Sequence, residues 1–247
     1  SAKWDMGWMN DTLRYLGRDF EHRRWHHEEL TFRSVYAFDE NFVLALSHDE
    51  VVHGKGSLLS RQPGDIRQQR AGLRLLFGYQ FGLPGKKLLF MGSELGPVGE
   101  WDHEQELPWG LLDDPGTSAV LAWVAELNDL YRREPALHCV DDSADGFSFV
   151  VGDDDENSVV AFLRHAPDER SVLVVCNFRP ELHSDYRIGV PDAGRWVEIA
   201  NSDREEYGGD GVVNTTVETD DEPSHGHETS LAITVPPLGV CFLAHDG

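Results

Sequence analysis

Cysteine is scarce in this chain, and no long run of apolar residues occurs. The three cysteines, Cys139, Cys176 and Cys241, are odd in number and far apart, which argues against a disulfide framework and against a Cys-x-x-Cys metal site. Cys176 and Cys241 lie in apolar runs, so we expect them to be buried as small hydrophobic residues. No apolar stretch reaches the roughly eighteen residues of a membrane-spanning helix, and the N-terminus lacks a signal-peptide pattern. The sequence therefore predicts a cytoplasmic protein without a membrane partner.

Basic residues are also few. There are 21 Lys and Arg against 44 Asp and Glu, which gives a formal net charge of −23. A field of this sign repels nucleic acids and anionic membranes, because both are bound through basic patches. The composition therefore argues against nucleic-acid partners and favours neutral ligands.

Motifs for several common chemistries are missing. No Gly-rich phosphate loop, Ser-His-Asp triad signature or zinc-ligand spacing is present. His22 and His26 are four residues apart and would share a helix face, but no third ligand is evident. We therefore predict neither a metal site nor a cofactor.

The pattern of apolar residues changes near residue 135. Before it, strand-like runs at 3–6, 41–46 and 87–92 alternate with helix-like segments at 10–16, 21–30, 65–81 and 118–133. We expect Asn10 or Asp11 to cap the first helix and Asp65 the third. This alternation is typical of a parallel α/β sheet or barrel. Eight strands close a barrel, which is more than this region can supply.

From about residue 138 the pattern is all-β. Short apolar runs are separated by turn signals such as Gly152-Asp153 and Asp192-Ala193-Gly194. The spacing predicts an antiparallel β-sandwich of about 110 residues. Residues 205–227 are rich in Gly, Asp and Thr, and we expect them to form a long loop. The predicted strands are 146–151, 158–163, 172–178, 195–200, 231–235 and 239–244.

Ser47, His48, Asp49 and Glu50 follow directly after the predicted strand 41–46. In α/β barrels the carboxyl ends of the strands carry the chemistry, whereas the opposite ends contribute stability. Ionisable side chains at such a strand end therefore predict the rim of an active site.

Three blocks of sequence resemble consecutive motifs of the glycogen branching enzymes, which belong to the alpha-amylase superfamily. They are residues 3–9 (KWDMGWM), 46–54 (LSHDEVVHG) and 88–92 (LLFMG). Further matches cover essentially the whole chain in order, although Ser93 stands where the family usually has Asn. These further matches are His26-His27 with residues 30–32, residues 63–65, Glu100-Trp101, and Ser230-Leu231 with residues 235–238.

This resemblance implies a fold of class α/β plus all-β. Residues 1–134 would be the C-terminal part of a (β/α)₈ TIM barrel, from strand six to strand eight. Residues 138–247 would be the antiparallel β-sandwich domain that follows the barrel in this superfamily.

The resemblance also implies a reaction. Branching enzymes cut an α-1,4-glucan and transfer the cut piece to a 6-hydroxyl, making an α-1,6 branch with retention of configuration. Retention needs a nucleophilic carboxylate and an acid/base carboxyl about 5 Å apart. In the family both lie on earlier barrel strands, so we expect them to be absent from these 247 residues and the isolated chain to be inactive. Asp49 matches the family's third carboxylate, and His48 matches a substrate-binding histidine.

Asp49 has a definite physical role in such a reaction. The transition state resembles an oxocarbenium ion, and hydrogen bonds to the ring hydroxyls strengthen as that charge develops. A carboxylate is a strong acceptor for these hydroxyls, and His48 can donate from either ring nitrogen. The structural alternatives are a helix cap or a salt bridge for Asp49, and a buried core residue for His48.

Four further residues are weaker candidates for contacts with substrate. Trp4 and Trp101 are expected near strand ends, where their flat faces can stack on sugars, but Trp is also a common packing residue. Glu50 either lines the site or braces its loop, and Asp65 either contacts substrate or caps a helix.

We therefore predict the C-terminal portion of a branching enzyme that binds α-glucan. Its other partner would be the missing N-terminal half of the barrel, if that half is encoded separately. One alternative is a related hydrolase of malto-oligosaccharides. A second is a non-catalytic glucan-binding or assembly fragment, which the absence of two carboxylates favours.

Overall fold

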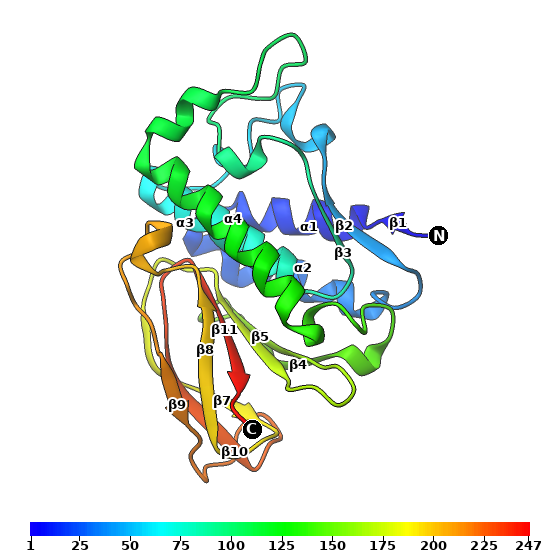
Figure 1. Cartoon of the computed structure of the whole chain (residues 1–247), viewed down its shortest axis with the longest axis vertical. Coiled ribbons are helices and arrows are strands. Elements are labelled where there is room, and N and C mark those ends of the chain that lie inside the picture. Colours follow the sequence, from blue (N-terminus) through cyan, green and yellow to red (C-terminus); the bar gives the residue numbers. More distant parts are fainter.

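A computed structural model describes all 247 residues. The first half of the chain forms the upper part of the molecule in Figure 1, and the second half forms antiparallel sheets below it. Three short parallel strands pair in the order β1-β2-β3, as the alternating pattern predicted, and they do not close into a ring. These strands are β1 (Lys3–Trp4), β2 (Phe42–Leu46) and β3 (Lys86–Leu89).

Four α-helices accompany the parallel sheet. They are α1 (Met6–Leu16), α2 (Glu28–Thr31), α3 (Ile66–Gly82) and α4 (Pro115–Arg133). The predicted helix at 21–30 is instead a 3₁₀ helix followed by the single turn α2. The 3₁₀ helices are Phe20–His26, Phe32–Val35, His48–Val51, Ser93–Leu95, Trp109–Asp113, Pro135–Leu137, Ala144–Gly146 and Glu205–Tyr207.

Local sequence patterns predicted one of two helix caps correctly. Asp65 caps α3 as predicted, and its Oδ1 accepts from the backbone N–H groups of Arg67 and Gln68. The predicted cap of α1 was wrong. Asp5, and not Asn10 or Asp11, begins that helix by accepting from the Trp8 amide at 2.9 Å. The carboxylate directly after β1 caps the helix at its first turn, before either predicted residue is reached.

The second half of the chain forms two antiparallel sheets. A six-stranded sheet has the order β4-β5-β6-β11-β8-β9, and a two-stranded sheet pairs β10 with β7. Two of these strands were not predicted. Five of the eight residues of β7 are not buried, and three-residue β9 lies inside the predicted loop. The strands are β4 (Phe147–Asp154), β5 (Val159–Arg164), β6 (Val172–Asn177), β7 (His183–Val190), β8 (Arg195–Asn201), β9 (Thr216–Glu218), β10 (Thr229–Val235) and β11 (Gly239–His245).

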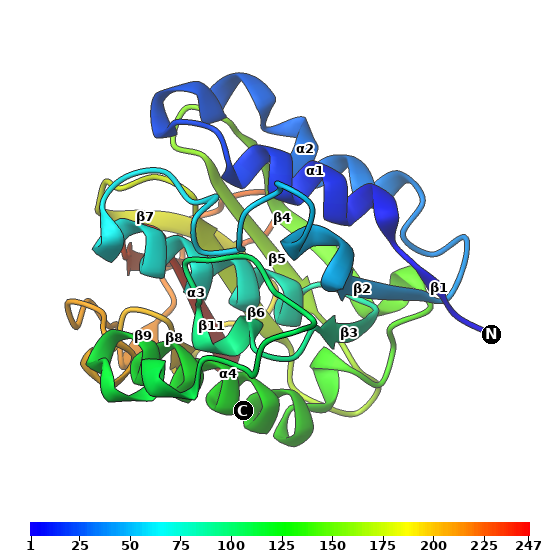
Figure 2. The same cartoon turned by 90° about the horizontal axis from the view of Figure 1, so that it is seen from above.

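One hydrophobic core joins the helices to the six-stranded sheet. A cluster of 36 buried residues includes side chains from α1, α3 and α4 together with β5, β6 and β11. Helix α3 lies against β6 and β11, as Figure 2 shows. A second cluster of 14 residues fills the space between the two antiparallel sheets and includes Cys241. Cys176 and Cys241 are buried as predicted.

The parallel sheet is open at both edges. Strands β1 and β3 each pair only with β2, and both residues of β1 are exposed. None of the helices combines the length and the apolar character that crossing a membrane requires.

Candidate functional site

The carboxyl ends of β1, β2 and β3 lie at one edge of the sheet because the three strands are parallel and adjacent. Trp4 ends β1, Ser47 follows β2, and Phe90 follows β3. The backbone N–H of Phe90 donates to the carbonyl of Leu46 at 2.9 Å, which continues the pairing into the loops. The structure therefore brings the polar residues after β2 next to the aromatic residues after β3.

Asp49 and His48 lie at this edge with their side chains open to solvent. The carboxylate of Asp49 is 54% exposed and the imidazole of His48 is 50% exposed, and His48 Nε2 lies 3.3 Å from Asp49 Oδ1. No Lys or Arg side chain pairs with the Asp49 carboxylate. The His48 ring packs at 5.8 Å from the ring of Phe90. Both side chains can therefore reach a ligand, and neither caps a helix nor lies in the core.

Glu50 holds the turn that carries these two residues. Its Oε2 accepts from the backbone N–H of Ser47 at 2.6 Å and from the Ser47 hydroxyl at 2.7 Å, which makes a capping box for the 3₁₀ turn His48–Val51. The residue is only 2% exposed. Of the two roles expected for Glu50, bracing fits this geometry, because the carboxylate faces the loop and not the solvent.

Trp4 and Trp101 differ in how much of the side chain a ligand can reach. Trp4 is 44% exposed at the end of β1, so part of its ring is available to a ligand. Trp101 is partly buried, packs edge-on against Phe90 with ring centroids 5.0 Å apart, and donates its backbone N–H to the Val51 carbonyl. The Trp101 ring thus packs on the segment after β3, and its backbone joins that segment to the loop after β2.

Asp65 does not join this edge of the sheet. It caps α3 and borders a different pocket of about 250 Å³, where it lies with Arg67, Arg74 and Asp203. Of the two roles expected for Asp65, the helix cap fits this geometry, and a contact with substrate stays a prediction.

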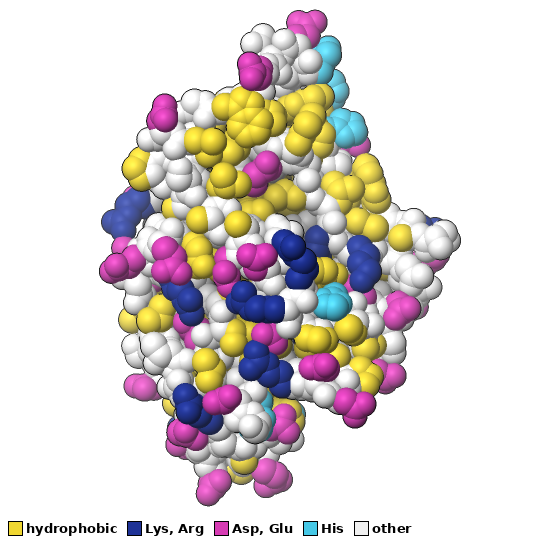
Figure 3. Space-filling view, in the orientation of Figure 1, with side chains coloured by type: hydrophobic (Ala, Val, Ile, Leu, Met, Phe, Trp, Pro, Cys, Tyr) yellow, Lys and Arg dark blue, Asp and Glu magenta, His cyan; other side chains and the backbone are white.

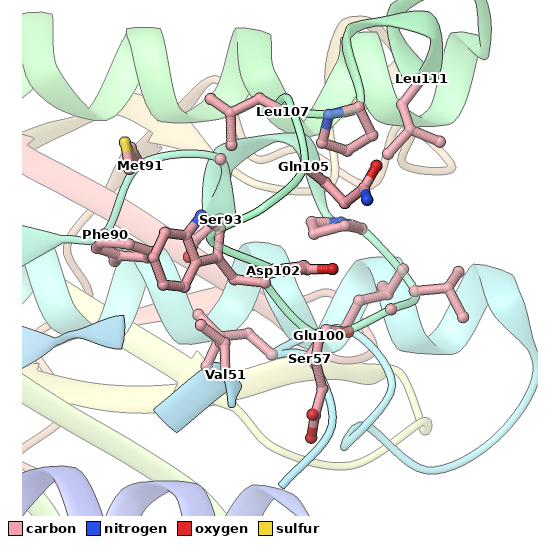
Figure 4. Close-up of a pocket in the computed structure, with 18 of the residues that line it drawn as sticks. Val51, Ser57, Phe90, Met91, Ser93, Glu100, Asp102, Gln105, Leu107 and Leu111 are labelled. Atoms are coloured by element: carbon pink, nitrogen blue, oxygen red, sulfur yellow. The ribbon is translucent and has the colours of Figure 1, made fainter. Parts of the chain in front are cut away.

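A pocket of about 380 Å³ lies behind the strand ends (Figure 4). The loop after β3 supplies most of its wall, including Phe90, Met91 and Leu107, and Val51 closes it on the β2 side. His48 and Asp49 do not line it. Val98 and Trp109, in the segment after β3, are exposed apolar side chains. Figure 3 shows apolar side chains gathered in the upper part of the molecule. The sequence analysis did not identify this pocket.

Asp5 is a buried residue of the strand ends that the sequence analysis missed. Its carboxylate accepts from Arg33 Nε at 2.7 Å and from the Tyr36 hydroxyl at 3.1 Å, and the residue is 2% exposed. Burial, followed by the Asp5 charge, raises the pKa of Tyr36. This buried network fixes the end of β1. The sequence feature that could have identified Asp5 is a carboxylate directly after a strand.

Metal ligation finds no support in the arrangement of side chains. No three His, Cys, Asp or Glu residues are grouped so as to hold an ion.

Comparison with known proteins identifies the relatives of this chain. Residues 149–246 match the family model of the alpha amylase C-terminal all-beta domain. The 1,4-alpha-glucan branching enzyme GlgB of Aquifex aeolicus (strain VF5) is 54% identical over 247 residues, which is 99% of this chain and 39% of the relative. Over nearly its full length, this chain is similar to branching enzymes. The resemblance drawn from the sequence blocks is thereby confirmed.

Other relatives agree. GlgB of Aromatoleum aromaticum is 54% identical over 98% of this chain and 38% of its own length, and GlgB of Rubrobacter xylanophilus is 52% identical over 98% and 34%. The chain thus spans less than two fifths of the length of these relatives. The crystal structure of an AmyP variant in complex with maltotriose matches with a TM-score of 0.68 over 99% of this chain and 50% of that chain, at 13% identity. This match shows a shared fold.

Proposed function

We propose that the chain is the C-terminal portion of a 1,4-alpha-glucan branching enzyme. In this proposal residues 1–134 form strands six to eight of a (β/α)₈ barrel, and residues 138–247 form the β-sandwich domain that follows it. The order of three parallel strands with flanking helices, followed by antiparallel sheets, supports this division. So does the similarity to branching enzymes over nearly the whole chain.

In the proposed reaction a carboxylate on an earlier barrel strand attacks the anomeric carbon, and a second carboxyl protonates the leaving glucan. The 6-hydroxyl of an acceptor chain then attacks the covalent glycosyl-enzyme, gives its proton to the carboxylate that had acted as the acid, and releases the nucleophilic carboxylate, so that two inversions give net retention. Both of these carboxyl groups belong to the part of the barrel that precedes residues 1–134.

Asp49 and His48 contribute to this reaction from the open edge of the sheet. The Asp49 carboxylate accepts hydrogen bonds from ring hydroxyls, and these bonds strengthen as positive charge develops on the sugar. His48, 3.3 Å from Asp49, donates to a neighbouring hydroxyl. Trp4 offers an exposed face against which a glucosyl ring can stack. The observation that carries the proposal is an exposed Asp49 carboxylate at a strand end that pairs with no Lys or Arg side chain.

The test is an assay of the complete protein on amylose. Branching activity raises the fraction of α-1,6 linkages with little gain in reducing ends. A malto-oligosaccharide hydrolase would instead raise the number of reducing ends without forming α-1,6 linkages. A non-catalytic glucan-binding fragment would migrate more slowly in a gel that contains amylose. It would change neither the fraction of α-1,6 linkages nor the number of reducing ends. If the other half of the barrel is a separate chain, activity should require both chains together.

A further inference from the structure

We propose that Glu100 is a positioning residue that anchors the loop following Asp49. It does so by binding the backbone of residues 54–56, which we call the 54–56 loop. This inference rests on the proposed function, because it assigns Glu100 to the placement of Asp49 in that reaction. Glu100 lies in the loop after β3, whereas Asp49 lies in the loop after β2, so the contact joins two neighbouring strand ends.

The central contact spans 44 residues of sequence. The backbone N–H of Gly56 donates to Glu100 Oε1 at 2.7 Å. The backbone has positive φ at His53 (59°), Gly54 (80°) and Gly56 (75°). Successive backbone N–H groups in a turn of this kind can point towards a common anion. A non-glycine residue in this region, here His53, is held only where surrounding contacts determine the backbone.

The charge state of Glu100 agrees with this geometry. The backbone amides of Gly56 and Gly54, and more weakly that of Lys55, hold the pKa of Glu100 below its ordinary value. Glu100 is therefore ionised at neutral pH, and hydrogen bonds to an ionised acceptor are stronger than those to a neutral one. In Figure 4 Glu100 lies on the same side of the pocket as Ser57, away from Met91.

The 54–56 loop is itself connected to Asp49. Lys55 Nζ donates to the backbone carbonyl of Asp49 at 2.8 Å. Arg61 donates through Nε to the Lys55 carbonyl at 2.8 Å, and through Nη2 to the carbonyl of Glu50. Movement of Lys55 would therefore release the carbonyl of Asp49.

A second connection runs beside the first. The residue after Glu100, Trp101, donates its backbone N–H to the Val51 carbonyl at 2.9 Å. The two adjacent residues thus hold the β2 loop on both sides of its turn, at Val51 and at Gly56. Glu100 makes its hydrogen bond to the loop through its side chain, whereas Trp101 uses its backbone, so substitution can remove the Glu100 bond.

The side chain of Glu100 is exposed, so its removal leaves the core intact. The expected effect is on the position of Asp49 rather than on the fold. Misplacement of a reacting group by about 1 Å can lower the rate about a hundredfold. Binding of long glucans depends on many contacts along the chain and should change little.

The experiment uses Glu100→Ala and Glu100→Gln in the complete enzyme, with Glu106→Gln as the control. Glu106 lies in the same loop, and its replacement removes the same charge without a contact to the 54–56 loop. For Glu100→Ala we expect kcat for α-1,6 transfer to fall about 10- to 100-fold, with KM for amylose within about threefold. Glu100→Gln should be intermediate, because the amide oxygen still accepts a hydrogen bond.

Amide hydrogen exchange gives a readout independent of activity. The amides of Gly54, Lys55 and Gly56 should exchange faster in Glu100→Ala than in the wild type or in Glu106→Gln. Unchanged exchange with unchanged kcat would overturn the inference, and so would a raised KM with normal kcat, which would place Glu100 on the glucan. If the wild type makes no α-1,6 linkages, the proposed function fails, while the exchange measurement still decides whether Glu100 anchors the loop.

Discussion

Asp49 and His48 share one short turn after β2. The surroundings of the Asp49 carboxylate differ from those of the other carboxylates beside β1 and β2. Asp5 and Glu50 are buried and hydrogen-bonded by their own loops, so they shape the backbone. The Asp49 carboxylate is half exposed and has only His48 beside it. Among the acidic residues adjoining β1 and β2, Asp49 is therefore free to accept bonds from a ligand.

His27 makes the stability of the chain depend on pH. It is buried at 6% exposure, and neither ring nitrogen has a hydrogen-bond partner. Burial lowers the pKa of His27 below its ordinary value of 6.5, although Asp155 and Asp154 oppose the shift. Because the unfolded chain binds the proton more readily, the stabilisation from neutral His27 is present above about pH 6.5 and is lost as the pH falls below it.

We expect the free energy of unfolding of residues 1–247 to decrease between pH 7.5 and pH 5.5, and to decrease less in His27→Gln. Urea titrations at both pH values, followed by tryptophan fluorescence at low protein concentration, measure the difference. His22→Gln is the control, because His22 is exposed in the 3₁₀ helix Phe20–His26 that ends just before His27. Equal pH dependence in the wild type and in His27→Gln would rule out His27 as the source.

The sequence predicted the roles of some of these residues and not those of others. Asp65 was predicted as a cap because its signal is local: a carboxylate ahead of a helical pattern. Asp49 and His48 were found through their place after a strand and through the family resemblance. The bracing role of Glu50 has a local signal, because Ser47 and Glu50 have the spacing of a capping box. The contact of Glu100 with Gly56 joins loops 44 residues apart, and no local pattern carries that information.

At the scale of elements, helix α3 determines how the two halves of the molecule meet. It packs on β6 and β11 through the main core. Gly78 lies at the closest approach, where an added Cβ would stand 2.2 Å from Val240 Cγ1 and 3.3 Å from the Trp123 ring. Val240 is fully buried in β11, so it has little room to move.

We therefore expect Gly78→Ala to destabilise the chain. Overpacking a core costs about 1–3 kcal/mol, which exceeds the gain of up to about 1 kcal/mol from replacing a helical Gly by Ala. Urea unfolding of residues 1–247 at pH 7.5 measures the change. Gly110→Ala, where an added Cβ meets nothing within 4 Å, should stay within about 0.5 kcal/mol of wild type. A Gly78→Ala variant as stable as wild type would show that β11 shifts to make room for the added methyl group on α3.

The elements themselves were mostly predictable. Strands with continuous apolar runs, such as β5 and β6, are buried at every position and were predicted. β7 was missed because His183, Ser184 and Asp185 precede its buried residues, and β9 was missed because three residues carry too little pattern. Pairing with β8 and β10, not local preference, makes these segments strands.

At the scale of the whole molecule, the three-stranded parallel sheet is open at both edges. Its outer strands leave backbone groups unpaired, and exposed sheet edges promote association. Apolar side chains at 44–72% exposure, including Trp4, Met6 and Val35, add to this tendency. We expect residues 1–247, expressed alone, to self-associate, with an apparent mass in sedimentation that rises with concentration. A monodisperse monomer that melts cooperatively at all concentrations would contradict this expectation.

The same polypeptide should make no branches by itself. Under the proposed function the nucleophile and the acid/base carboxyl group lie on barrel strands outside residues 1–134, and one further carboxylate cannot replace both of them. Purified residues 1–247 incubated with amylose should leave its α-1,6 content unchanged, as measured by debranching and chain-length analysis. A rise in α-1,6 linkages would show that these residues contain a complete catalytic set.

Asp49→Asn in the complete enzyme tests whether the Asp49 carboxylate takes part in the transfer reaction. The substitution keeps the shape of the side chain and removes its charge, so we expect kcat for α-1,6 transfer to fall by about a hundred- to a thousandfold or more. The affinity for amylose should stay within about threefold. Asp102→Asn, an exposed carboxylate after β3, should change neither quantity. Transfer at the wild-type rate by Asp49→Asn would remove Asp49 from the mechanism and contradict the account.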